Sequence, residues 1–312
     1  MAGLNWGDVN TVTKRYILPY ITDQIYTSNP LFLFMARKGI KLSGGRDIEY
    51  PVLYAKVPGG SYRGFDTLDV SWVSQVQNAN LDWKQYYAAV TVDGLTEILN
   101  GGPDAVITLV SAYMENARRK LEDALGTDLY GSNTNVKALD GLQAAIDDST
   151  NVATYAGIPR STNTFWKATY LDNGASPITL PIMQTAYGNC TFGQTAPDLI
   201  VCPQAIYNEV WNKVQPQQRF GNGEGVGIGF PYIQFNGAKI MVDQHFATAV
   251  GTLGMYFLNT EFMELWVHKL RDFFLTGWMQ PTNQDARTAH LYWAGNIGIT
   301  ACRYFEQITD CV

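Results

Sequence analysis

The feature that most constrains this chain is a long stretch with no strand or helix pattern, residues 55–80, set between two strand-like segments. Residues 48–54 read as a strand, and Pro51 places it at a sheet edge because proline cannot donate to a strand ladder. Residues 81–92 read as the returning strand. Structureless segments of this length are uncommon inside compact domains and usually serve function or partner contact. We therefore predict a long β-hairpin over residues 47–92 with an extended loop.

The composition of the chain favours a partner for this loop over disorder. The loop contains the large side chains Tyr62, Phe65, Leu68 and Trp72. Only 16% of all residues are charged, where about 25% is usual, although hydrophobic residues make up an ordinary 46%. Interface cores are depleted in charge and enriched in aromatic residues. We infer that the chain hides much of its surface against other chains.

Charge is unevenly distributed along the chain. Residues 1–46 contain six basic and two acidic residues, a net charge of +4, whereas the whole chain has a net charge of −6. A basic N-terminal arm on an acidic body predicts attraction between copies or to an acidic partner. A merely solvated segment is the alternative, although apolar residues such as Tyr16 and Ile17 are more than a free tail needs.

The clearest helix follows the hairpin. Pro103 and Asp104 form a start signal, Gly131 is a plausible stop, and apolar residues recur between them every three or four positions. We predict a long helix over residues 103–131. The rest of the chain alternates between helix and strand patterns, which predicts a small mixed sheet with helices and then a strand-rich end. We expect helices at 179–187 and 203–214, and strands at 198–201, 239–242, 254–258, 263–267 and 289–305, the last interrupted by Gly295 and Gly298.

Several functional classes are disfavoured. The negative net charge argues against a protein that holds nucleic acid mainly through a basic face. No run of eighteen apolar residues predicts a membrane span, and the N-terminal residues show no secretory signal pattern. The four cysteines lack CxxC spacing, which favours free thiols in a reducing cytoplasm.

No catalytic or cofactor motif stands out. The glycine-rich run 221–229 does not fit a dinucleotide fingerprint, and Glu224 would repel phosphate, so we interpret it as a flexible surface loop. Asp243 and His245 share a strand face and could supply two metal ligands, but no third ligand is predictable. We expect no enzymatic activity, no cofactor and no metal.

The order of these parts resembles the major capsid proteins of tailed bacteriophages, which have the Hong Kong 97 fold, and the resemblance covers essentially the whole chain. Each matching stretch is short, and their order is what makes the resemblance. The stretches are 29–34 (NPLFLF), 47–52 (DIEYPV), 62–68 (YRGFDTL), 197–203 (PDLIVCP) followed by Tyr207, 257–260 (FLNT) and 285–298, which contains LYWAGN.

The resemblance implies an α+β fold with four parts. These are an N-terminal arm at 1–46, an extended loop at 47–92, a peripheral domain at 93–135 and 256–294 with a spine helix at 103–131, and an axial domain at 136–255 and 295–312. It further implies that arm and loop contact neighbouring subunits and that the glycine-rich loop lies near the centre of a capsomer. Candidate inter-subunit contacts are Lys14, Arg15, Tyr16, Phe32, Phe34, Arg37, Tyr62, Arg63, Phe65 and Trp72; candidate capsomer-centre residues are Gly221, Gly223, Glu224 and Gly225.

The function implied is assembly of hexamers and pentamers into an icosahedral phage head around double-stranded DNA, with non-specific contact to that DNA. The expected partners are other copies of the chain, a separate scaffolding protein, a portal and a decoration protein, and the expected location is the virion, assembled in the bacterial cytoplasm. Some members form a lysine–asparagine cross-link between subunits, for which Lys56 and Lys84 are the lysines in or near the loop. Two alternatives stay open: an encapsulin-like nanocompartment shell and a cytoplasmic hydrolase with an unrecognised site.

Overall fold

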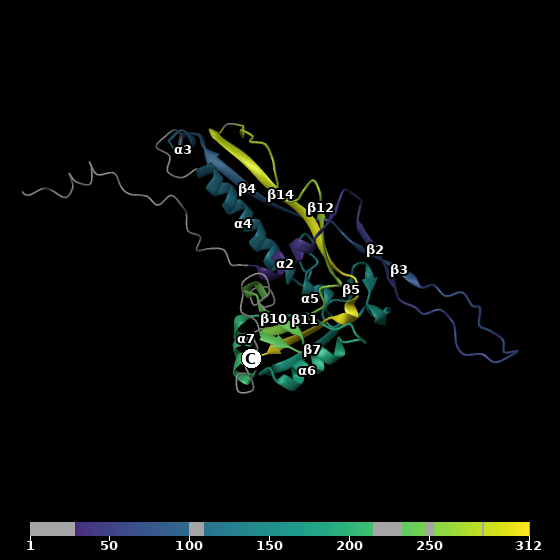
Figure 1. The fold of residues 1–312 in the computed structure, drawn as a ribbon. Helices are drawn as coiled ribbons and strands as arrows, with labels where there is room; N and C mark the ends of the chain where they lie inside the picture. Colours follow the sequence, from purple (N-terminus) through teal and green to yellow (C-terminus); the bar gives the residue numbers. More distant parts are fainter. Residues whose placement is uncertain (1–28, 100–108, 215–232, 247–252, 283, 312) are drawn as a thin grey trace, which may run out of the picture. The chain divides into compact units, whose positions relative to one another are not determined.

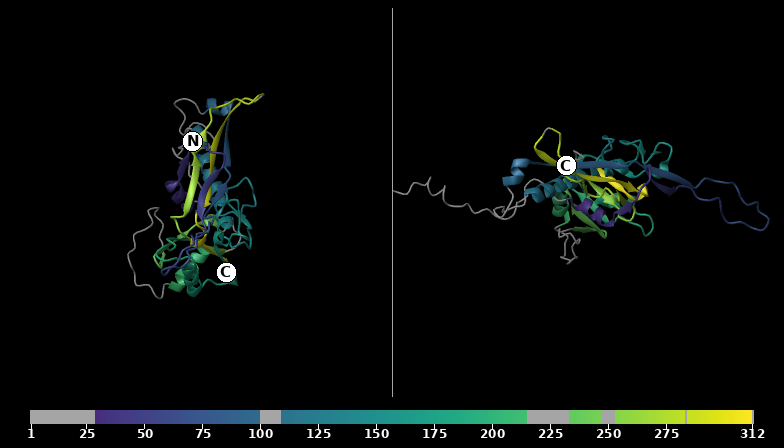
Figure 2. Two further views of the ribbon diagram at one scale, coloured as in Figure 1. Left: turned by 90° about the vertical axis from the view of Figure 1, so that its right-hand side faces the viewer. Right: turned by 90° about the horizontal axis from the view of Figure 1, so that it is seen from above.

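The computed structural model describes residues 29–99, 109–214, 233–246, 253–282 and 284–311. The chain divides into two compact units. Within the described residues, unit 1 comprises 88–99, 109–120 and most of Leu275–Leu291, and unit 2 contains the remainder. Figure 1 labels the elements, and Figure 2 gives two further views. The fold mixes helices with several sheets, as an α+β fold requires.

Unit 2 contains a mixed six-stranded sheet with strand order β7-β15-β11-β8-β10-β9. Strand β8 is parallel to β10 and β15 is parallel to β7, whereas β11 runs antiparallel to both β8 and β15. The strand bounds are β7 Thr169–Ser176, β8 Leu199–Cys202, β9 Ile233–Phe235, β10 Ala238–Val242, β11 Leu253–Leu258 and β15 Glu306–Cys311. The predicted strands at 198–201, 239–242 and 254–258 are confirmed to within one or two residues.

Helices α6 (Leu180–Asn189) and α7 (Gln204–Val214) cover one face of this sheet. Thr179 caps α6 by accepting a hydrogen bond from the backbone N–H of Ile182. Because strand side chains alternate between faces, Ile200 packs in the core under the helices, while Val201 packs in the larger core on the opposite face. All of β8 is therefore buried, which explains its continuous apolar run.

The second large sheet has strand order β1-β12-β14-β13, and β4 also pairs with β14. Its strands are β1 Ile40–Leu42, β4 Lys84–Asp93, β12 Met263–His268, β13 Phe274–Leu275 and β14 Ala286–Ile299. The predicted interruption of the last strand by Gly295 and Gly298 is wrong, because β14 runs through both. A Cβ on Gly298 would overlap the Trp266 ring, so this glycine makes room for an indole from the neighbouring strand.

The hairpin differs from its prediction. Strand β2 (Ile48–Leu53) pairs antiparallel with β3 (Val76–Leu81), so the returning strand lies inside the stretch predicted to be structureless. The predicted return at 81–92 corresponds to β4, which pairs with β14 instead. The β3 sequence VQNANL contains amide side chains where strands usually have branched or aromatic ones. For this reason the sequence pattern did not indicate a strand here. The loop that connects the two strands is therefore residues 54–75.

Four further helices lie in the described part of the chain. They are α2 (Pro30–Lys38), α3 (Gly94–Leu99), α4 (Leu109–Leu129) and α5 (Leu142–Ala145). The predicted long helix corresponds to α4, although residues 100–108 lie outside the described part of the chain. Leu121 and Leu125 on its predicted apolar stripe are at most 2% exposed, and Leu129, one turn further on, is fully buried. After α4 the chain turns at Gly131, whose N–H donates to the carbonyl of Asp128.

Several small elements complete the described fold. They are the strand pair β5 (Thr154–Tyr155) with β6 (Ile158–Pro159), and the 3₁₀ turns Thr164–Trp166 and Cys302–Tyr304. Arg160 lies among them with no exposed surface and donates hydrogen bonds to the carbonyls of Ala144, Ala145, Val152 and Trp166. A single buried guanidinium thus satisfies backbone acceptors that would otherwise lack partners.

Candidate assembly surfaces

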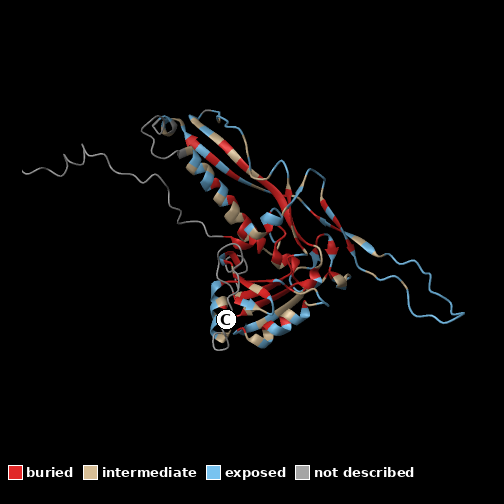
Figure 3. Cartoon of the chain, in the orientation of Figure 1, coloured by how far each residue is buried: buried red, intermediate tan, exposed pale blue. Residues whose placement is uncertain are grey.

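The loop of residues 54–75 presents an unusual amount of apolar side chain to solvent. Figure 3 shows nearly all of it in the exposed colour. Phe65 and Trp72 are fully or almost fully exposed, at 108% and 87%, although aromatic side chains of this size are normally buried. Tyr62, Leu68 and Val70 are also exposed. Large apolar residues exposed together in one segment are typical of interaction surfaces.

Short-range polar contacts give this loop local order. The backbone N–H of Arg63 donates to the Asp66 carboxylate at 2.7 Å, and the N–H of Asp66 donates to the Arg63 carbonyl at 3.1 Å. Gly64 between them has a φ of +55°, which glycine adopts without strain. Hydrogen bonds from Ser71 hold the pKa of Asp69 below its usual value. Each bond stays within the loop, so the aromatic side chains remain free to contact another molecule.

Helix α2 carries three of the candidate contact residues, and these differ in how far they are exposed. The side chain of Asn29 caps the helix by accepting from the N–H of Phe32. Phe32 is 2% exposed and packs in the core, so it faces its own chain and offers little surface to another copy. Arg37 is exposed, whereas Phe34 is partly buried, with the Lys38 ammonium 4.9 Å from its ring centre.

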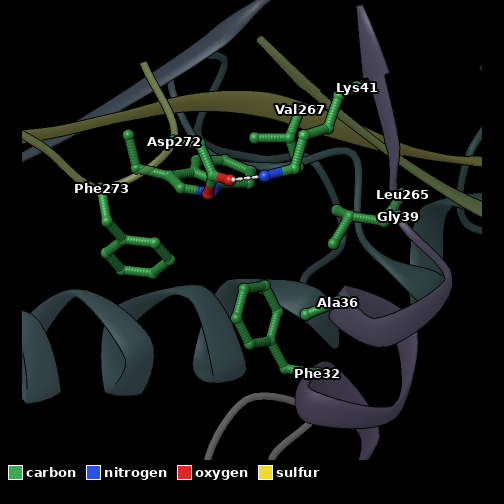
Figure 4. A pocket seen from close by; sticks show the side chains of 9 residues that line it. Phe32, Ala36, Gly39, Lys41, Leu265, Val267, Asp272 and Phe273 are labelled. Carbon is green, nitrogen blue, oxygen red and sulfur yellow. Dashed lines mark hydrogen bonds and ion pairs between the residues drawn. The ribbon is translucent and has the colours of Figure 1, made fainter. Parts of the chain in front are cut away.

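A small pocket lies beside α2 (Figure 4). Its walls are mostly apolar side chains from α2, β12 and β14, and Lys41 forms an ion pair with Asp272 at 2.6 Å across it. The lining residues are Phe32, Ala36, Gly39, Lys41, Leu265, Val267, Asp272, Phe273 and Trp293. It contains no nucleophile–base pair and therefore shows no catalytic arrangement.

The remaining candidate contacts lie outside the described residues. These are Lys14, Arg15 and Tyr16 in the arm, and Gly221, Gly223, Glu224 and Gly225 in the glycine-rich run. Their proposed roles stay predictions. The contact roles of the exposed loop residues, Arg63 included, likewise stay predictions.

The two lysines considered for cross-linking have opposite environments. Lys56 lies exposed in the loop. Lys84 is 6% exposed, lies 3.5 Å from the buried carboxylate of Asp140, and donates to the carbonyl of Val136. Asn296 donates to the other oxygen of Asp140 at 2.6 Å. Lys84 is therefore enclosed by its own chain and is not available to a neighbour in this structure.

His245 belongs to a buried hydrogen-bonded network that the sequence did not reveal. Its Nδ1 lies 3.2 Å from Asp243 and its Nε2 lies 3.0 Å from Asp123 of α4. Tyr130 donates to the second oxygen of Asp243 at 2.9 Å. The predicted strand face for Asp243 and His245 is wrong, because β10 ends at Val242 and both residues follow it. Asp123 is more than a hundred positions away in the sequence. Among the described residues no group of three potential ligands fits a metal ion.

No protein-family model and no curated protein matches this chain. Solved structures do match, over nearly the whole length of both chains. The capsid asymmetric unit of cyanophage A-1(L) has a TM-score of 0.73 at 17% identity and covers 99% of each chain. The capsid of a native GTA particle has a TM-score of 0.73 at 9% identity, covering 99% of this chain and 100% of the other. The holo-SrpI encapsulin complex of Synechococcus elongatus has a TM-score of 0.67 at 8% identity, covering 100% and 96%.

The element order and the end-to-end coverage together decide the fold. A match of one sheet or one helix would be compatible with many architectures, but these matches cover 99% or more of this chain. In the described residues no helix is both long and apolar enough to cross a lipid bilayer. Because the matches to capsid subunits cover the chain from end to end, the chain has the Hong Kong 97-type fold of tailed-phage major capsid proteins.

Proposed function

We propose that this chain is the major capsid protein of a tailed bacteriophage, which assembles into hexamers and pentamers of an icosahedral head. The observation that carries the proposal is the end-to-end match to a phage capsid subunit, with 99% of each chain covered. The exposed apolar loop supports it, because an isolated subunit would leave those side chains in water. The chain acts structurally and catalyses no reaction.

The loop supplies part of the assembly energy. Burying one large apolar side chain contributes about 1.5–3 kcal/mol, so the five exposed ones of the loop contribute about 10 kcal/mol together. Association of two proteins costs about 4–15 kcal/mol in lost translational and rotational freedom. One loop alone therefore roughly balances that cost. A subunit that gives its loop and arm to neighbours and receives theirs gains a surplus, which makes closed shells favourable over free subunits.

The basic arm and the glycine-rich run complete the proposed contacts. Residues 1–46, with their net charge of +4, would lie on the acidic body of a neighbouring copy. The run 221–229 would lie near the capsomer centre. A separate scaffolding protein, a portal and a decoration protein are the proposed partners in the virion, which is assembled in the host cytoplasm, and contact with packaged double-stranded DNA would be non-specific.

Expression of the full chain, alone and with its flanking genes, tests the function. Negative-stain electron microscopy and size-exclusion chromatography should reveal closed particles in the megadalton range. A small oligomer under both conditions would refute the proposal.

The role of the loop is tested by paired substitutions. Phe65→Ser with Trp72→Ser should leave a folded subunit that forms no closed shells. The control is Val136→Ser with Trp211→Ser, which removes an aliphatic and an aromatic side chain that are exposed elsewhere, at 75% and 41% respectively. Normal shells from the loop variant would show that assembly does not depend on these side chains.

An encapsulin-like shell is the second candidate, because the encapsulin match covers the whole of this chain. The two functions differ in what the particle encloses. Particles from the native source should contain nuclease-protected DNA of genome length, and the flanking genes should encode a terminase and a portal. A copurified enzyme cargo and no protected DNA would favour the encapsulin function.

A further inference from the structure

The hydrogen-bond geometry around His245 favours the protonated, positively charged form of its imidazole. Both ring nitrogens face carboxylate oxygens, Asp243 at 3.2 Å and Asp123 at 3.0 Å. A carboxylate only accepts hydrogen bonds, so both nitrogens must carry a proton for both contacts to be bonds. Neutral imidazole has one N–H and one lone pair, and the lone pair would face an oxygen. The observed arrangement is therefore that of an imidazolium.

The two carboxylates are not equivalent. The side chain of Asp243 has no exposed surface, accepts from the Tyr130 hydroxyl, and also accepts from the backbone N–H of His245 at 3.0 Å. The side chain of Asp123 is 30% exposed and can be hydrated in place of its bond to His245. When the imidazole loses a proton, the Asp243 contact is the better supported one, so the contact to Asp123 is the one that breaks.

We propose that His245 is a pH-sensitive latch that ties the C-terminal half of α4 to the end of β10 when protonated and releases it when neutral. The groups that face His245 among the described residues are Asp123 from α4 and Asp243 from its own segment, with Tyr130 joined through Asp243. Neighbouring Phe246 packs against the rings of Tyr130 and Tyr256 and brings no charge.

The pH range follows from the direction of the shift. The hydrogen bond to Asp243, opposed by burial and aided by Asp123, raises the pKa of His245 above its usual value. A raised histidine pKa means that the stabilisation is complete below about pH 6.5, the unfolded value. It is lost as the pH rises through the folded value. The latch is a property of one chain and does not depend on the proposed shell assembly, so either proposal can fail alone.

Hydrogen–deuterium exchange of the full chain, read by mass spectrometry between pH 5.5 and 9, tests the latch. After correction for intrinsic exchange rates, protection of residues 121–129 should fall with rising pH. The fall is about tenfold for each pH unit between the unfolded and folded pKa values. His245→Gln should be weakly protected at every pH and show no step. His268→Gln, in a partly buried histidine outside the network, should keep the step.

A second variant, Asp123→Asn, distinguishes the pH-sensitive latch from a purely structural role of the network. It keeps the size and the acceptor oxygen but removes the charge, so the midpoint of the step should move to lower pH. Because Asp123 is partly exposed, this variant should fold. An unchanged midpoint in Asp123→Asn, a step that persists in His245→Gln, or a wild type without any step would each overturn the latch.

Discussion

Glu306 makes the stability of the six-stranded sheet depend on pH. It lies at the start of β15 with no exposed surface. One carboxyl oxygen is contacted only weakly, by Asn189 at 3.4 Å, and the other has no hydrogen-bond partner. Burial raises the pKa of Glu306 to about 7 from an ordinary 4.5. The folded protein therefore keeps the proton over a range in which the unfolded chain has lost it.

The sign of the effect follows from which state binds the proton. Between pH 4.5 and 7 the folded state holds more protons than the unfolded state, so the free energy of unfolding falls as pH rises. At about 1.36 kcal/mol per pH unit, the difference of 2.5 between the two values of Glu306 corresponds to a loss of at most about 3 kcal/mol by pH 8. With about 2 °C per kcal/mol for a chain of this size, the melting temperature should fall by about 6 °C.

Glu306→Gln isolates this contribution, because the amide has the same shape and cannot ionise. Thermal unfolding of the full chain should give similar melting temperatures for this variant and the wild type at pH 5. At pH 8 the variant should be the more stable by several degrees. Glu261→Gln, which alters an exposed carboxylate, should follow the wild type at both pH values. If Glu306→Gln and the wild type lose stability in parallel from pH 5 to pH 8, the buried carboxyl is not the cause.

Two further substitutions test the packing. Gly298→Ala places a methyl group inside the Trp266 ring and should cost about 1–3 kcal/mol by overpacking; an unchanged denaturation midpoint would show that the ring can move aside. Arg160→Met leaves four backbone carbonyls without their donor and should cost about 3 kcal/mol or more, visible as loss of soluble folded protein. Normal yield and melting temperature for this second variant would contradict the importance of the guanidinium.

The elements that were predictable have local signals that agree with their burial. Strand β2 alternates between buried and exposed positions, so its period of two is visible in the sequence. Helix α6 begins at a threonine cap followed by Pro181, and α4 has a leucine stripe that is buried in the structure. In each case propensity, capping and pattern indicate the same conformation.

The elements that were missed depend on distant partners. Strand β15 has the polar sequence EQITDC, and it is a strand because β7 and β11 flank it in the centre of a sheet. Gly298 reads as a strand breaker until Trp266 on the adjacent strand is known. The same holds for the candidate sites: the loop aromatics were visible in the sequence, whereas the link between Asp123 and His245 exists only once α4 packs against the end of β10.

The low charge content and the buried titratable groups together determine how the stability of the subunit depends on pH. Only 16% of the residues are charged, and apolar contacts within a unit respond little to pH. Buried titratable groups such as Glu306 and His245 do respond to pH. Both have raised pKa values, and in both the stabilising state is the protonated one. Mild acid should thus tighten the subunit and mild alkali should loosen it, at the six-stranded sheet and at α4 together.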